Sequence, residues 1–184
     1  MRHAPAEAGA VRAAAARARA REGRVFASAS PEETEAIGAR LAGGLVDGDV
    51  VSVVGELGAG KTRFVRGVLI GLGAAGGGQS PTFVVERVYE GRLLAHHIDL
   101  YRLDGARQLA EVGIPDRFSD GGVFLVEWGD RAAGLLPAER IDVAIEDLGG
   151  TARRIRIEAP IDRIGSLAER GGRERRGAGR GEDG

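Results

Sequence analysis

The chain lacks cysteine altogether and has little lysine and few aromatic residues. The absence of cysteine among 184 residues excludes disulfide bonds and thiolate metal sites, and it suits a reducing compartment. No apolar run approaches the roughly 20 residues that cross a bilayer. The Ala- and Arg-rich N-terminal region also lacks the apolar stretch of a secretory signal. We therefore expect a cytoplasmic protein with no membrane contact.

The chain also lacks an excess of charge of one sign. Its formal net charge is −1, whereas dedicated binders of nucleic acids or anionic membranes usually show a basic excess. Hydrophobic residues make up 43% of the sequence, and the length suits one domain with a sizeable core. These properties are typical of an ordinary globular protein.

Both terminal regions have compositions that do not favour a packed core. Residues 1–23 scatter arginine through alanine with almost no bulky apolar side chains, so a disordered basic arm is favoured over a functional helix. Residues 163–184 are rich in glycine and in charges of both signs, which is typical of a solvated, disordered tail. The sequence therefore predicts a folded domain over residues 24–162.

Strand and helix patterns alternate within this domain. A helix is predicted after Ser30, a capping residue followed by Pro31 and Glu33, and another from Lys61 to about residue 72. Strands are predicted at residues 24–30, 49–54, 83–89, 92–98, 122–127, 141–147 and 153–159, with hairpins joining the third to the fourth and the sixth to the seventh. This order predicts a three-layer α/β sandwich with a mixed β-sheet.

One segment matches a phosphate-binding loop in full. Residues 55–62, GELGAGKT, fit the Walker A pattern G-x-x-x-x-G-K-[ST] between a buried strand and a helix. Its glycines let successive backbone N–H groups converge on phosphate oxygens, and the helix N-terminus adds positive potential. The predicted nucleotide-binding residues of this loop are Gly55, Glu56, Leu57, Gly58, Ala59, Gly60, Lys61 and Thr62. With this loop, the predicted single-domain sandwich is of the P-loop NTPase type.

Lys61 is the one lysine among the 26 basic residues. We expect its compact ammonium to reach the β- and γ-phosphates of a nucleotide, where the wider planar fork of arginine would crowd the loop. Thr62 offers a hydroxyl to Mg²⁺. A GTPase would need a second lysine in an Asn-Lys-x-Asp element, so this class is excluded.

Phosphoryl-transfer sites of this kind also need a carboxylate at the end of a neighbouring apolar strand. Asp99 follows the strand pattern at 92–98, and Glu127 ends the pattern at 122–127. Either acid can hold Mg²⁺, directly or through water, or orient the attacking water. The alternative for each is an acid that only forms a salt bridge at a strand end.

Other residues near these strands allow more than one interpretation. Residues 79–82, which include Ser80 and Thr82, follow a glycine run and suit either a loop that orders around the γ-phosphate or an ordinary turn. His96 and His97 are consecutive, so on a strand they face opposite sides and do not chelate one metal together. Trp128 directly follows Glu127 and is expected near the nucleotide, in a core or a stacking role.

These segments, in this order, resemble a known family. The stretches VVGELGAGKT, SPTF, HIDLYRL, EVGIPDRF and LVEW are similar to those of the bacterial tRNA threonylcarbamoyladenosine biosynthesis ATPase family, TsaE (YjeE). The resemblance covers residues from about 30 to 158. The last four segments make it specific, since a phosphate loop alone occurs in many families.

The resemblance implies a Mg²⁺-dependent ATPase that binds ATP and ADP and supports threonylcarbamoyl modification of adenosine 37 in ANN-decoding tRNAs. It implies slow hydrolysis, a complex with the TsaB–TsaD transferase, and contact with tRNA through that complex. It assigns Thr62 and Glu127 to Mg²⁺ and Asp99 to the vicinity of the γ-phosphate. It assigns Ser80 and Thr82 to a switch loop, and Trp128 to the side of the metal site.

Two other functions are compatible with a phosphate loop. A small-molecule kinase needs an arginine-rich lid, for which the segment at 102–107 supplies Arg102 and Arg107 and little else. A nucleotide-gated interaction module differs from a slow ATPase mainly in its rate of hydrolysis. Phosphorylation of a small metabolite would identify the kinase.

Overall fold

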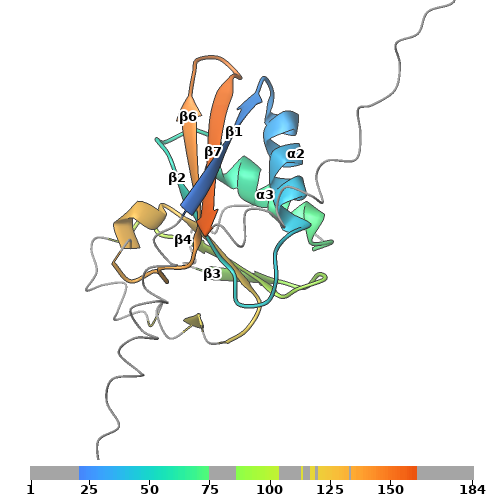
Figure 1. The fold of residues 1–184 in the computed structure, drawn as a ribbon, viewed down its shortest axis with the longest axis vertical. Coiled ribbons are helices and arrows are strands. Elements are labelled where there is room, and N and C mark those ends of the chain that lie inside the picture. The colour runs from blue at the N-terminus through green and yellow to red at the C-terminus, as the bar shows by residue number, and fades with distance from the viewer. Residues whose placement is uncertain are drawn as a thin grey trace, which may run out of the picture.

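A seven-stranded mixed β-sheet forms the centre of the structure (Figure 1). The computed structural model describes residues 21–74, 86–103, 113, 117–118, 120–132 and 134–160. The strands are β1 (Arg21–Ser28), β2 (Val50–Val54), β3 (Glu86–Tyr89), β4 (Ala95–Asp99), β5 (Val123–Glu127), β6 (Ile141–Asp147) and β7 (Arg153–Pro160). The helices are α2 (Pro31–Ala42), α3 (Lys61–Gly71) and the short 3-10 helix η1 (Gly129–Ala132).

The strand order is β1-β7-β6-β2-β5-β4-β3. Strands β6, β2, β5 and β4 run parallel to one another, while β1–β7, β7–β6 and β3–β4 are antiparallel pairs. Both predicted hairpins and the mixed sheet are therefore confirmed. Because β2, β4 and β5 are parallel, their carboxyl ends meet at one edge of the sheet, where ligands bind in open α/β sheets.

Helix α2 begins as its capping pattern predicts. The Ser30 side chain accepts a hydrogen bond from the backbone N–H of Glu33, and Pro31 occupies the first turn. The Glu33 carboxylate in turn accepts a 2.7 Å hydrogen bond from the backbone of Ala29. The helix ends at Ala42, so Leu45 packs in the core from the connection that follows.

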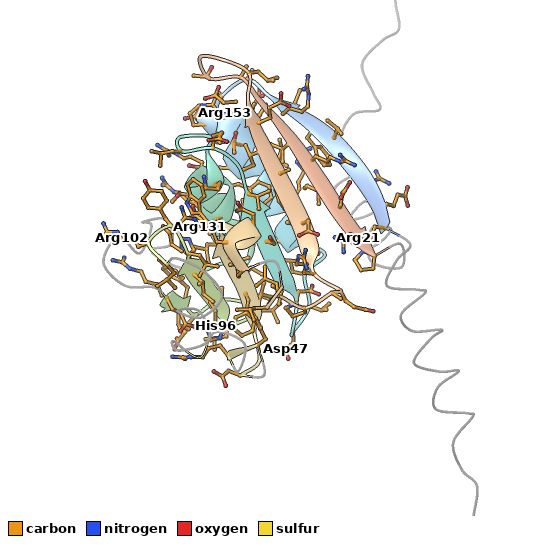
Figure 2. All side chains as sticks on the ribbon, turned by 90° about the vertical axis from the view of Figure 1, so that its left-hand side faces the viewer. Arg21, Asp47, His96, Arg102, Arg131 and Arg153 are labelled. Carbon is orange, nitrogen blue, oxygen red and sulfur yellow. The ribbon has the colours of Figure 1, made fainter. Side chains whose placement is uncertain are left out.

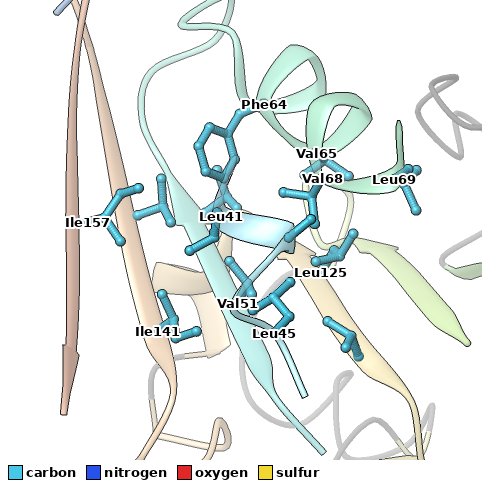
Figure 3. Close-up of a cluster of buried hydrophobic side chains, with 14 of the residues drawn as sticks. Leu41, Leu45, Val51, Phe64, Val65, Val68, Leu69, Leu125, Ile141 and Ile157 are labelled. Carbon is cyan, nitrogen blue, oxygen red and sulfur yellow. The ribbon is translucent and has the colours of Figure 1, made fainter. Parts of the chain in front are cut away.

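Helices α2 and α3 cover one face of the sheet (Figure 3). Their apolar stripes pack on the central strands, with Phe64 and Val51 both completely buried. The two helices approach closely, because a Cβ atom added at Gly67 would lie 2.0 Å from the carbonyl oxygen of Glu35. Among the described residues, the other face is covered by η1 and adjoining loop residues, including Leu136. The prediction of an α/β P-loop-like fold with a mixed sheet is thus confirmed.

The observed strand boundaries differ most from the predicted ones at β1 and β4. Strand β1 begins at Arg21, so residues 21–23 belong to the sheet and not to the N-terminal arm. The Arg21 side chain bonds Asp142 at 2.8 Å and the carbonyl of Glu158 at 3.0 Å, long-range partners that local composition does not reveal. Strand β4 begins at Ala95, not at residue 92, because the Arg92 backbone N–H donates to the carbonyl of Leu72, after α3, and not to a neighbouring strand. The Arg92 side chain donates to the carbonyls of Ala42 and Leu45.

The predictions for the two termini and for several loop residues concern residues that the structure does not describe. Residues 1–20 and 161–184 lie outside the described residues. The same holds for residues 79–82, and hence for Ser80 and Thr82, and for Arg107. The predicted strand at 83–89 is described from Glu86 onward.

Candidate nucleotide site at the carboxyl edge of the sheet

The phosphate loop connects β2 to α3 through glycines with positive φ angles. Gly55 has φ 152°, and a Cβ atom there would lie 2.4 Å from the carbonyl oxygen of Ile145. Gly60, at the N-cap of α3, has φ 106°, in the left-handed region that favours glycine. The loop thus depends on glycine at both ends, and it leads directly into the helix N-terminus, where anions bind.

Lys61 folds back over this loop and is nearly enclosed. Its Nζ donates hydrogen bonds of 2.8 Å to the carbonyl oxygens of Gly55 and Glu56, and it lies 3.6 Å from the ring centroid of Trp128. The residue is 5% exposed. The ammonium group therefore contacts the loop backbone on one side and an aromatic face on the other.

The pKa of Lys61 reflects two opposing influences. Burial lowers the pKa of its ammonium group below the usual range, because the charged form loses hydration. The negative charges of Glu127, Asp99 and Asp130 act in the opposite direction, together with Glu56. The site thus combines a partly desolvated cation with several acids that favour its charged form.

Glu127 and Thr62 meet at the centre of the site. The Thr62 hydroxyl donates a 2.9 Å hydrogen bond to Oε2 of Glu127, a residue that is 2% exposed. Asp99 is paired in register with Glu127 on the adjacent parallel strand. The structure therefore brings together the two predicted strand-end acids and the phosphate loop. Asp99 Oδ1 also accepts a 2.9 Å hydrogen bond from the backbone N–H of Tyr101.

Trp128 lies beside the phosphate loop because the backbone turns sharply after β5. Its φ angle is 60°, unusual for a bulky residue, and its N–H donates to the carbonyl of Val53 at 2.9 Å. The ring centroid also lies 5.1 Å from that of Tyr101, and the ring packs against the buried apolar residues on the face of the sheet opposite α2 and α3. Trp128 therefore makes core contacts and a tilted contact with a second aromatic ring.

Two residues outside the predicted set, His97 and Arg153, also contact the site. His97 lies on β4 and is completely buried, with Nε2 2.8 Å from Oε1 of Glu127. Arg153, at the start of β7, donates from Nε to the carbonyl of Ala59 at 2.9 Å (Figure 2). The position of His97 at the start of the HIDLYRL segment is the sequence feature that could have indicated its role. No local pattern distinguishes Arg153 from the many other arginines.

The oxygen atoms at this edge suit a Mg²⁺ ion. A hydroxyl and a carboxylate are hard ligands, and Mg²⁺ is usually held by one or two such groups together with substrate phosphates and water. Within the described ranges, no group of three or more histidine or acidic side chains is placed to hold a metal alone. This donor set fits a metal that binds together with a nucleotide.

The fold and the loop define the class to which the chain belongs: single-domain α/β proteins of the P-loop type. Comparison with known proteins then identifies the family, since the model of the threonylcarbamoyl adenosine biosynthesis protein TsaE matches residues 28–155. The chain belongs to the TsaE family.

Individual relatives agree with this assignment. The chain is 38% identical over 141 residues to the tRNA threonylcarbamoyladenosine biosynthesis protein TsaE of Bacillus subtilis, covering 76% of this chain and 88% of the relative. The protein of the same name from Treponema pallidum is 36% identical over 130 residues, covering 71% of this chain and 96% of the relative. The crystal structure of Bacillus subtilis YdiB superposes with a TM-score of 0.63 at 35% identity, covering 81% of this chain and 93% of that chain.

None of the helices in the described residues is both long and apolar enough to cross a membrane.

Proposed function

We propose that this protein binds ATP with Mg²⁺, hydrolyses it slowly, and supports threonylcarbamoyl modification of adenosine 37 in ANN-decoding tRNAs. The observation that carries the nucleotide part is the hydrogen bond from Thr62 to the buried Glu127, directly beside Lys61 and the phosphate loop. The names of the relatives, which are tRNA threonylcarbamoyladenosine biosynthesis proteins, support the tRNA-modification part.

Each residue of the site has a distinct task in this proposal. The backbone N–H groups of residues 55–62 and the Lys61 ammonium bind the β- and γ-phosphates. Thr62 and Glu127 would hold Mg²⁺, which neutralises charge on the β- and γ-oxygens when bound. Asp99 lies beside Glu127 in the sheet and orients the water that attacks the γ-phosphate. Trp128 excludes water from one side of Lys61.

We further propose that the protein acts in the cytoplasm on the TsaB–TsaD complex and meets tRNA through it. Slow hydrolysis suits a protein whose nucleotide state controls binding, because a long-lived ATP state leaves time for the partner to engage. Ser80 and Thr82 are proposed to belong to the loop that reports the γ-phosphate.

The proposal is tested by capture of the TsaB–TsaD proteins on the purified chain with ATP and with ADP. We expect capture to depend on the nucleotide, and phosphate release from ATP to rise when the complex is added. Glu127→Gln is expected to reduce phosphate release. Phosphorylation of a small metabolite, without stimulation by the complex, would favour the kinase.

A further inference from the structure

Two consecutive histidines on β4 make equivalent contacts on opposite faces of the sheet. His96 is 4% exposed and its Nδ1 lies 2.7 Å from Oε1 of Glu86, while its ring stacks on Phe124 at 4.4 Å. His97 is 0% exposed and its Nε2 lies 2.8 Å from Oε1 of Glu127. Each histidine therefore contacts one glutamate, but only Glu127 belongs to the candidate nucleotide site.

The carboxylate of Glu127 is held at both oxygens. Oε1 is bonded to His97 and Oε2 accepts from Thr62 at 2.9 Å. The terminal torsion of a glutamate is otherwise broad, so a single contact would leave the plane of the carboxylate poorly defined. When the carboxylate is ionised, as a metal ligand is, it accepts hydrogen bonds and does not donate them, and Nε2 of His97 is then the donor. None of the described residues offers a partner to its other ring nitrogen, Nδ1.

We propose that His97 is a positioning residue that fixes the orientation of Glu127 for Mg²⁺. This inference rests on the proposed function, in which Thr62 and Glu127 hold the ion. Thr62 is then itself a metal ligand. The Glu127 carboxylate has two hydrogen-bond partners among the described residues, Thr62 and His97, and His97 is the one that would not itself bind the ion. Groups that orient a metal ligand in this way typically change metal affinity by about 10- to 100-fold when they are removed.

The neighbouring histidine provides a matched control. His96→Leu and His97→Leu each remove a buried imidazole and its bond to a glutamate from adjacent positions of one strand (Figure 2 labels His96). Both are expected to lower thermal stability. His97→Gln is a second variant, because the glutamine amide nitrogen lies about as far along the side chain as Nε2 and can donate to Oε1.

The experiment measures ADP affinity of the full chain by calorimetry, with Mg²⁺ and with EDTA. For the wild type and His96→Leu we expect Mg²⁺ to tighten ADP binding by the same factor. For His97→Leu we expect this factor to fall about 10-fold or more, with the affinity in EDTA within about twofold of the wild type. His97→Gln is expected to recover most of the factor, which a purely structural role would not explain.

The possible outcomes separate the inference from the function on which it rests. If Mg²⁺ tightens ADP binding equally in the wild type and both His97 variants, the positioning role is wrong and the proposed function stands. If the wild type shows no Mg²⁺ effect, the metal part of the proposed function fails, and the inference fails with it. If His97→Leu does not fold by circular dichroism, His97→Asn replaces it: its shorter amide does not reach Oε1, and retention of the full Mg²⁺ effect would overturn the role.

Discussion

At the scale of single residues, Lys61 shows why one lysine persists in a chain whose other basic residues are all arginine. Its Nζ fits between two carbonyl oxygens at 2.8 Å and the Trp128 ring at 3.6 Å, in a space that leaves the residue 5% exposed. An arginine guanidinium is planar and wider, and it presents its donors as a fork. It would have to displace the indole or the loop backbone.

We therefore expect Lys61→Arg to weaken ATP binding by at least about tenfold, which corresponds to about 1.4 kcal/mol. Calorimetry measures the affinity, and the fluorescence of Trp128, the sole tryptophan, reports the same event. Arg63→Lys is the control, because this residue lies on the same helix with an exposed side chain that pairs with Glu35. Retained affinity in Lys61→Arg, with an unchanged circular dichroism spectrum, would contradict the explanation of the lone lysine.

At the scale of elements, the first residue of β7 supports the phosphate loop through hydrogen bonds to its backbone. Arg153 donates from Nε to the carbonyl of Ala59 at 2.9 Å and from Nη1 to Asp147 at 2.8 Å (Figure 2). Its side chain is 14% exposed. The Arg153 side chain therefore links β7 to the loop that is proposed to bind phosphate.

Arg153→Leu is expected to cost about 1–3 kcal/mol of stability, because it leaves the buried carbonyl of Ala59 without this donor. ATP affinity should fall as well, because the loop loses a hydrogen bond that holds its backbone in place. Arg154→Leu is the matched control: its side chain is 54% exposed and pairs with an exposed Glu146, so we expect a change within about 0.5 kcal/mol. Urea unfolding and calorimetry measure both quantities. Equal effects of the two substitutions would show that Arg153 does not stabilise the phosphate loop.

The helix pair depends on glycine in a different way. A Cβ atom at Gly67 would lie 2.0 Å from the carbonyl oxygen of Glu35, so α2 and α3 would have to move apart. We expect Gly67→Ala to destabilise the fold by about 3 kcal/mol, at the upper end of the usual cost of overpacking. Gly134→Ala is the control, since a methyl group at that position would meet no other atom within 4 Å, and it should be nearly neutral in urea unfolding. A neutral Gly67→Ala would show that the helices separate easily.

Site residues that belong to a contiguous motif or end a strand pattern could be predicted from the sequence. Residues that contact the site only through the order of the strands could not. The loop from Gly55 to Thr62 is a contiguous motif, and parallel strands bring their carboxyl ends together, so the positions of Asp99 and Glu127 followed from local patterns. The contacts of His97 and Arg153 depend on which strands become neighbours. That order, with β6 beside β2 and β4 beside β5, is set by packing of the whole sheet and is not contained in any one strand.

At the scale of the whole molecule, the sheet has a buried parallel centre and antiparallel additions at both sides. All residues of β5 are buried, whereas β1 is largely exposed and carries Val25 at 63% exposure. The site is built on the carboxyl ends of the central strands, so its residues lie on the part of the sheet with the most tertiary support. The least buried strands, β1 and β3, are the two edge strands of the sheet.

This arrangement predicts a graded pattern of amide hydrogen exchange. Amides of β2 and β5 should exchange only through global unfolding, because both strands have hydrogen-bonded neighbours on each side and are buried on both faces. Amides of β1 and β3 should exchange faster through local opening.

ATP with Mg²⁺ should then slow exchange at residues 55–62, since the loop N–H groups are proposed to bind phosphate. Mass spectrometry with and without nucleotide measures all three regions. Exchange in β1 as slow as in β5 would contradict the graded stability, and unchanged exchange at residues 55–62 would contradict phosphate binding there.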